Sequence, residues 1–180
     1  MQLFTGRPQD VSNRLERENA VYDLLDRLHI PFERTDHEPA DTMEACSVID
    51  SVLGIVICKN LFLCNRQQTK FYLLMIREDK KFHTKEISSQ INSARLSFAG
   101  PEKMAEYLDI TPGSVSIMGL ANDTGNHVQL LVDEDVLAAE YVGCHPCINT
   151  SSLRLKTADV FGPFLQAVRH DYQTVHLSNE

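Results

Sequence analysis

The sequence predicts an α/β fold in a single domain, with a mixed β-sheet flanked by helices. Three observations predict it. Runs typical of strands alternate along the chain with amphipathic runs typical of helices. The strands expected at 54–64 and 69–77 are separated by a four-residue turn, so they pair as antiparallel neighbours. The length of 180 residues is typical of one domain, and no repeat, low-complexity stretch or linker divides it.

The first elements follow from periodicity and stop signals. Residues 12–29 predict an amphipathic helix, because their apolar side chains recur at helical spacing and Pro31 then stops it. A short strand is expected at 32–36, and a capping-box pattern begins a second helix at 42–51. Residues 54–64 are apolar at both odd and even positions, which predicts a strand covered on both faces.

The rest of the chain continues this alternation, with turns marked by Gly, Pro, Asn and Asp. The expected elements are, in order, a strand at 69–77, a helix at 84–92, a strand at 95–98, a helix at 101–108, strands at 114–118, 127–133, 139–142 and 152–155, and a helix at 157–170 with Pro163 inside it or at its true start. The tail after His170 is expected to be loosely held.

Composition places the chain among cytoplasmic globular proteins. Its 43% hydrophobic content is ordinary for that class. No apolar run approaches the length of a membrane helix, and the first 20 residues lack the apolar core of a signal peptide, so no membrane partner is expected. Five cysteines, an odd number without framework spacing, indicate a reducing compartment.

The charge is unevenly distributed along the chain. A net charge of −8 argues against a protein that coats nucleic acid non-specifically, because that mode of binding depends on phosphate neutralisation. Residues 59–103, however, carry nine basic residues against four acids, which is +5 there and −13 elsewhere. This segment is either an ordinary solvated face or a local contact surface for one end of a nucleic acid, and charge alone does not decide between them.

Lys59 is the most informative single residue. It lies between the apolar runs 55–58 and 61–64, with Asn60 beside it. An ammonium group in a strand buried on both faces is costly unless it is paired or opens into a cavity. Either the sheet has an edge or bulge here and Lys59 extends to water, or Lys59 lines a pocket, where it holds a phosphate or stabilises a developing oxyanion.

Two glycines, Gly113 and Gly119, bracket a short apolar segment at 114–118. A glycine within a strand often marks a place where a ligand or another backbone comes close. Ordinary turn chemistry also accounts for both glycines, so this pattern by itself is a weak signal.

Three interpretations compete for residues 143–149, which contain Cys144, His145, Cys147 and Asn149. The cysteine spacing occurs in thioredoxin-like dithiols, but those lie between a strand and a helix, whereas a strand is expected next here. A structural zinc site needs four ligands and no second motif supplies them, so no metal is expected. The third interpretation is a loop in which His145 and Asn149 face a pocket while the cysteines pack.

Four short motifs occur in order along the chain: Lys59-Asn60-Leu61-Phe62-Leu63, Leu96-Ser97-Phe98-Ala99, Pro112-Gly113-Ser114-Val115 with Gly119-Leu120, and His145-Pro146 with Asn149. Together they resemble the YbaK / prolyl-tRNA-synthetase-associated editing domain family. The resemblance covers about residues 15–170, which we take as the core of a single editing domain spanning 1–180. Within the family the chain looks most like the free-standing branch that clears alanine mischarged onto proline tRNA.

The resemblance implies a mixed, partly barrel-like sheet flanked by helices. It also implies an aminoacyl-tRNA hydrolase that cleaves the ester between an amino acid and the terminal adenosine, without a metal or organic cofactor. By motif position, Lys59 corresponds to the family's essential lysine, Gly119 to a glycine whose backbone positions substrate or water, and His145 to the histidine of the His-Pro element. The implied partner is the acceptor end of aminoacylated tRNA(Pro), with prolyl-tRNA synthetase as a further candidate; DNA binding is not expected.

The amino-acid specificity is the open point. The residues expected to contact the substrate or form the pocket wall are Asn60, Met43, Cys46, Met118 and Asn149. The family often has Pro-Phe before the glycine, where this chain has Ile117-Met118, and this departure leaves the size of the pocket undecided. Removal of cysteine from cysteinyl-tRNA(Pro), and a non-catalytic tRNA- or amino-acid-binding regulator of the same fold, stay as alternatives.

Overall fold

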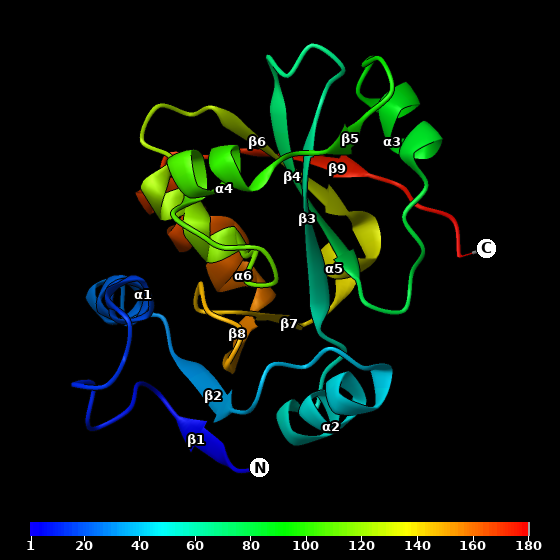
Figure 1. Ribbon diagram of the computed structural model, residues 1–180. Helices are drawn as coiled ribbons and strands as arrows, with labels where there is room; N and C mark the ends of the chain where they lie inside the picture. The colour runs from blue at the N-terminus through cyan, green and yellow to red at the C-terminus, as the bar shows by residue number, and fades with distance from the viewer. Residues whose placement is uncertain (180) are drawn as a thin grey trace.

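The computed structural model describes residues 1–179 and contains two β-sheets (Figure 1). The larger, sheet B, has the strand order β5-β3-β4-β6-β9. Its strands are β3 (Cys58–Cys64), β4 (Phe71–Arg77), β5 (Ser97–Phe98), β6 (Val128–Asp133) and β9 (Tyr172–Val175). The β5, β3 and β4 strands pair antiparallel, whereas β4, β6 and β9 run parallel. The predicted α/β architecture with a mixed sheet is therefore confirmed.

Sheet A is smaller and wholly antiparallel, with the order β1-β2-β8-β7. Its strands are β1 (Leu3–Thr5), β2 (Phe32–Asp36), β7 (Tyr141–Cys144) and β8 (Ser151–Lys156). The sequence predicted one sheet, and the division into two is a correction. Periodicity identifies strands but carries no information about which strands pair.

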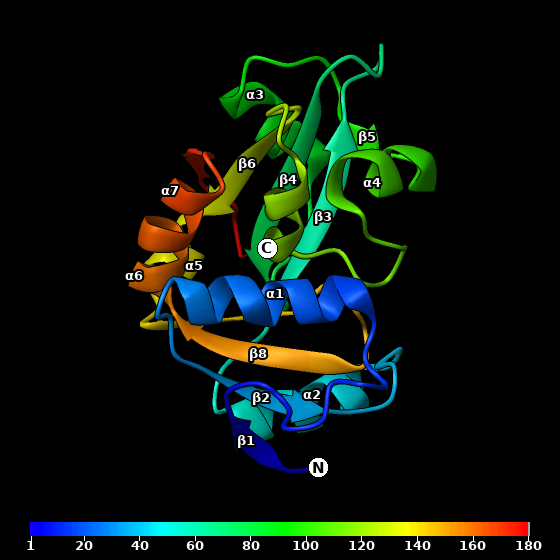
Figure 2. The same ribbon diagram turned by 90° about the vertical axis from the view of Figure 1, so that its left-hand side faces the viewer.

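The helices cover both sheets. They are α1 (Glu16–Arg27), α2 (Met43–Leu53), α3 (Thr84–Gln90), α4 (Pro101–Leu108), the 3₁₀ helix η1 (Ile117–Asn122), α5 (Glu134–Ala138), and a C-terminal helical segment made of α6 (Thr157–Asp159), the π-helical turn η2 (Val160–Phe164) and α7 (Leu165–Ala167). Figure 2 shows α1 lying alongside β8, between sheet A and the elements above it. No helix in the described chain is both long and apolar enough to cross a membrane.

Two apolar clusters hold these layers together. The larger one joins the inner face of α1 to both sheets, and it includes Tyr22, whose ring stacks on Phe32 at 5.6 Å between centroids. The smaller one lies on the opposite face of sheet B, under α3. Because β4 is between these clusters, its residues Phe71 to Ile76 are all buried.

Two predictions about local structure were wrong. Residues 114–118 do not form a strand, because η1 begins at Ile117, where the Ser116 hydroxyl caps it by accepting from the Met118 N–H at 3.1 Å. Residues 171–179 are not loosely held as predicted either. They contain β9, whose parallel pairing with β6 is a long-range contact that the local sequence does not signal.

Candidate active site

A cavity of about 290 Å³ lies where β3 begins, beneath α2 and next to the loops around residues 113–115 and 145–149. The residues that line it are Ala40, Asp41, Cys46, Ile49, Ile57, Cys58, Lys59, Asn60, Glu78, Gly113, Val115, His145, Asn149 and Ser152. Five residues that the sequence singled out for a site therefore meet in one place: Cys46, Lys59, Asn60, His145 and Asn149.

Lys59 lies at an open edge of sheet B. Within residues 1–179, β5 pairs only with Leu63 and Cys64, so the first residues of β3 lack a neighbouring strand on that side. Residues Lys59 to Leu61 are consequently half-buried, not covered on both faces as predicted. The Lys59 Nζ donates to the carbonyl oxygen of Glu78 at 3.2 Å. This edge lets an ammonium group enter the cavity from within an apolar strand.

Glu78 supplies a carboxylate to the same cavity, and the sequence analysis missed it. It directly follows β4, whose end pairs with the start of β3. Burial raises the pKa of Glu78, and the nearby charge of Lys59 opposes that shift. No local motif marks Glu78, since only the pairing of β3 with β4 brings it to Lys59.

The His145 ring is fixed by its backbone surroundings. Its Nδ1 lies 2.8 Å from the carbonyl oxygen of Ser151, so Nδ1 carries the proton and donates it. Nε2 is then left with a free lone pair. Burial lowers the pKa of His145 from its ordinary value of 6.5, which keeps the ring neutral at physiological pH.

A partly buried ionic network holds the segment that orients His145. The Ser151 hydroxyl donates to Asp36, and Asp36 also accepts from Arg14 and Arg34. Burial alone would raise the pKa of Asp36, but these hydrogen bonds outweigh it and hold that pKa well below its usual range. Asp36 therefore stays charged and keeps β8 in register beside β2.

Asn60 has an unsatisfied polar atom. Its Nδ2 donates to the Cys58 carbonyl at 3.4 Å, whereas its buried Oδ1 has no hydrogen-bond partner among the described residues. Leaving a buried acceptor unpaired costs about 1–3 kcal/mol. A donor from a bound molecule would remove that cost, and Asn60 lines the cavity where such a molecule would lie.

Gly119 lies outside this cavity. It is buried in η1, where a Cβ atom would come within 2.5 Å of the Ile110 Cδ1 and 3.1 Å of the Leu108 carbonyl oxygen. Its lack of a side chain allows η1 to pack against the end of α4. Gly113 is the glycine that lines the cavity, and its φ of +88° belongs to the left-handed region that favours glycine.

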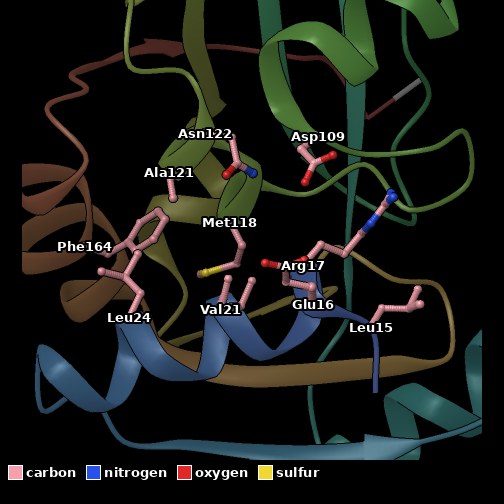
Figure 3. Close-up of a pocket in the computed structure, with 11 residues that line it drawn as sticks. Leu15, Glu16, Arg17, Val21, Leu24, Asp109, Met118, Ala121, Asn122 and Phe164 are labelled. Atoms are coloured by element: carbon pink, nitrogen blue, oxygen red, sulfur yellow. The ribbon is translucent and has the colours of Figure 1, made fainter. Parts of the chain in front are cut away.

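The two methionines predicted to form the pocket wall, Met43 and Met118, also lie outside this cavity. The Met43 side chain, at the start of α2, is 86% exposed. Met118 lines a second cavity of about 480 Å³ between α1 and η1. Figure 3 shows its sulfur next to Val21, on the side of Phe164. Of the three residues proposed as pocket walls, only Cys46 lines the Lys59 cavity.

Cys144 and Cys147 are free and buried. Burial raises the pKa of both thiols, to about 12 for Cys147, which is the opposite of the shift that makes a thiol reactive. Within residues 1–179, no group of three or more His, Cys, Asp or Glu side chains is arranged to hold a metal ion. The geometry thus favours packing over redox chemistry for this pair.

Comparisons with known proteins agree on one family. The sequence matches the aminoacyl-tRNA editing domain family over residues 37–161. It is 32% identical over 146 residues to the prolyl-tRNA editing protein ProX of Acetoanaerobium sticklandii, covering 81% of this chain and 89% of that protein. It is 27% identical over 165 residues to the prolyl-tRNA synthetase associated domain-containing protein 1 of Danio rerio, covering 91% of this chain and 85% of that protein.

The solved structures show a shared fold. One is a candidate trans-editing enzyme for prolyl-tRNA synthetase, which superposes with a TM-score of 0.66 over 91% of this chain and 99% of the other. Its sequence identity is 14%, so this likeness concerns the fold alone.

Proposed function

Because this chain belongs to the aminoacyl-tRNA editing domain family, we propose that it is a free-standing hydrolase that removes a wrong amino acid from proline tRNA, with alanyl-tRNA(Pro) as its main substrate. The observation that carries this proposal is the cavity in which Lys59, Asn60, Glu78 and His145 meet. The similarity to a prolyl-tRNA editing protein supports proline tRNA as the carrier. The proposed place of action is the cytoplasm, where charged tRNA is used.

The reaction is hydrolysis of an ester. A water molecule attacks the carbonyl carbon that joins the amino acid to the ribose of the terminal adenosine. The bond from that carbon to the ribose oxygen then breaks as a proton from the water passes to that oxygen, which leaves the free amino acid and a ribose hydroxyl. Negative charge develops on the carbonyl oxygen in the transition state. We assign its stabilisation to the Lys59 ammonium, because a preorganised donor aimed at a developing oxyanion is worth about 2.7–4 kcal/mol.

His145 positions the attacking water in this scheme. Its neutral ring presents the Nε2 lone pair as an acceptor, since Nδ1 already donates to Ser151. The hydrogen bond that holds the ring comes from a backbone carbonyl and not from a carboxylate, so His145 orients the water more than it removes a full proton.

The α-amino group of the substrate needs acceptors, and the cavity offers two. These are the Glu78 carboxylate and the unpartnered Oδ1 of Asn60. An alanyl group carries a primary ammonium with three N–H donors, whereas a prolyl nitrogen lies within a ring and has two. We propose that the ring's extra bulk and its missing donor exclude the correct prolyl group, because a site built for hydrogen bonds rejects an analogue that leaves them unmade.

The partner in this scheme is the acceptor end of aminoacylated tRNA(Pro), and each step uses side chains of this chain with no metal or organic cofactor. Prolyl-tRNA synthetase remains a candidate second partner. A non-catalytic role for the same fold would use the cavity for binding alone, and a cysteinyl substrate would use the same ammonium acceptors with Cys46 nearby.

The proposal is tested by incubating the purified protein with alanyl-, cysteinyl- and prolyl-tRNA of the proline isoacceptor and following release of each amino acid. We expect rapid release of alanine, slower release of cysteine, and prolyl-tRNA that survives at its spontaneous rate. Faster release of cysteine than of alanine would show that cysteinyl-tRNA(Pro), and not alanyl-tRNA(Pro), is the main substrate. Survival of all three would favour the non-catalytic regulator.

A pH profile tests the role given to His145. Its pKa lies below the ordinary 6.5 because of burial, so the neutral ring that the scheme requires persists into mildly acidic solution. We expect kcat/KM for alanyl-tRNA, corrected for spontaneous hydrolysis, to stay level as pH falls through 6.5 and to drop only at lower pH. The measurement covers about pH 5 to 8.

The control for this profile is His145→Gln, whose amide can accept a hydrogen bond but does not titrate. Its activity should be lower, and the fall in kcat/KM at acid pH should shrink to the part that protonation of Glu78, whose pKa burial raises, contributes. If kcat/KM of His145→Gln falls at acid pH in the same way as that of the wild type, His145 does not take part in the reaction.

A further inference from the structure

An aromatic pair with one exposed ring lies at strand β5 of sheet B, outside the cavity. Phe98 in β5 is 65% exposed, and its ring meets that of Phe82 edge-to-face at 5.9 Å between centroids. Phe82 is half-buried against the smaller apolar cluster, so it fixes the position of its partner. The Leu96-Ser97-Phe98-Ala99 motif, which the cavity does not use, thus presents a ring to solvent.

The pair shares a sheet face with Lys59. Phe98 lies opposite Leu63 in the β3–β5 register, and residues directly opposite each other point to the same side. Alternate residues of a strand also share a side, which places Lys59, Leu61 and Leu63 on that face. Lys59 and Leu63 are four positions apart in β3, a path of about 13 Å along the strand.

Three of the basic residues of the 59–103 segment lie near this pair in the sequence. Lys81 precedes Phe82, Lys85 lies in α3, and Arg95 lies just before β5; all three are exposed. In the described chain none of the three forms an ion pair. By contrast, three other basic residues of the segment are paired with carboxylates: Arg77, Lys80 and Lys103.

From this arrangement we infer that Phe98 and Phe82 form a stacking platform for the single-stranded nucleotides that precede the terminal adenosine of the tRNA. The inference rests on the proposed function, which puts the ester of that adenosine at Lys59. Single-stranded nucleic acids are bound by aromatic rings on which bases stack, beside basic side chains that attract the phosphates. Lys81, Lys85 and Arg95 supply the basic side chains. A few nucleotides are long enough to extend from Lys59 to Phe98.

The test is Phe98→Ala, assayed on two substrates. One is alanyl-tRNA(Pro), and the other is 3′-O-alanyl-adenosine, which has the ester but no preceding nucleotides. We expect KM for alanyl-tRNA(Pro) to rise by about tenfold, the order that loss of one stacked base gives. For alanyl-adenosine, kcat/KM should be unchanged, because that molecule does not reach Phe98. Phe98→Tyr keeps a flat ring and should behave like the wild type.

A matched control is Tyr172→Ala. Tyr172 is also an exposed aromatic residue on an edge strand, 41% exposed and in edge-to-face contact with Phe161 at 5.4 Å, but it lies in β9 at the opposite edge of sheet B. This variant should leave KM for both substrates unchanged. Lys81→Gln with Arg95→Gln should make the KM for alanyl-tRNA(Pro) less sensitive to salt, because two phosphate contacts are removed.

The outcomes separate this inference from the function on which it rests. If the wild type hydrolyses both substrates and Phe98→Ala keeps the wild-type KM for the tRNA, the platform is wrong and the active site stands. If the wild type hydrolyses neither, the proposed function itself has failed. A change of molecular mass in solution on Phe98→Ala, with no change in KM, would assign the pair to contact with a second copy of the chain and overturn the inference.

Discussion

Replacing Lys59 by alanine is expected to lower kcat/KM for alanyl-tRNA(Pro) by about 10²- to 10³-fold, the effect of removing one preorganised oxyanion donor. Lys59 is the only lysine or arginine that lines the cavity in the described chain, so no neighbouring cation replaces its charge. The loss should appear mainly in kcat, because the developing charge exists in the transition state and not in the bound ester.

The measurement is single-turnover release of alanine from alanyl-tRNA(Pro), with a melting curve of each protein to show that it is folded. Lys59 is half-buried at a strand edge, and its Nζ donates to a backbone carbonyl oxygen, so alanine should leave the fold intact. The matched control is Lys156→Ala, which removes an exposed lysine at the end of β8 and should keep the wild-type rate. A folded Lys59→Ala protein that deacylates at the wild-type rate would contradict the assigned mechanism.

The largest expected loss of stability comes from Lys80→Met. The Lys80 ammonium is buried, donates to the Asp133 carboxylate at 2.7 Å and to the Leu177 carbonyl at 3.0 Å, and lies 2.7 Å from Asp135. The side chain of Asp133 is 0% exposed, so methionine at position 80 would leave a buried carboxylate without its cation. Breaking a buried pair in this way costs about 3–5 kcal/mol in the free energy of unfolding.

Urea denaturation measures this cost, with Lys103→Met as the control. Lys103 also pairs with a carboxylate, that of Glu106, but both side chains are exposed and the expected change is about 0–1 kcal/mol. Adding Asp133→Asn to Lys80→Met should restore part of the stability, because the amide oxygen can still accept from the Leu177 N–H without carrying a charge. Equal losses in Lys80→Met and Lys103→Met would show that the buried cluster does not hold the C-terminal segment.

Much of the architecture follows from local sequence. The helix before Pro31, the strand at 32–36 and the pair of strands on either side of the Asn65 turn are where the sequence places them, to within a few residues at their ends. These elements depend on periodicity, capping and turn residues, and each of these signals is contained within a dozen neighbouring residues. The family too is readable from the sequence, because four short motifs in order suffice to identify it.

Local patterns misled wherever a long-range contact decided the conformation. Residues 114–118 look like a strand, yet Gly119 allows η1 to pack on Ile110 and Leu108, and a helical turn forms instead. The chain after His170 looks like a free tail, yet β6 offers it an edge and the Lys80–Asp133 pair fastens Leu177.

The sequence by itself determined the fold class, the family and the identity of Lys59 and His145 as residues of interest. Only the tertiary structure decided which residues share the cavity. It brought Glu78 to Lys59, put Gly113 there in place of Gly119, and turned Met43 to solvent and Met118 to the second cavity. The physical reason is that a side chain's identity is local, whereas its neighbours are set by strand pairings between residues far apart in the chain, such as β2 with β8 and β3 with β4.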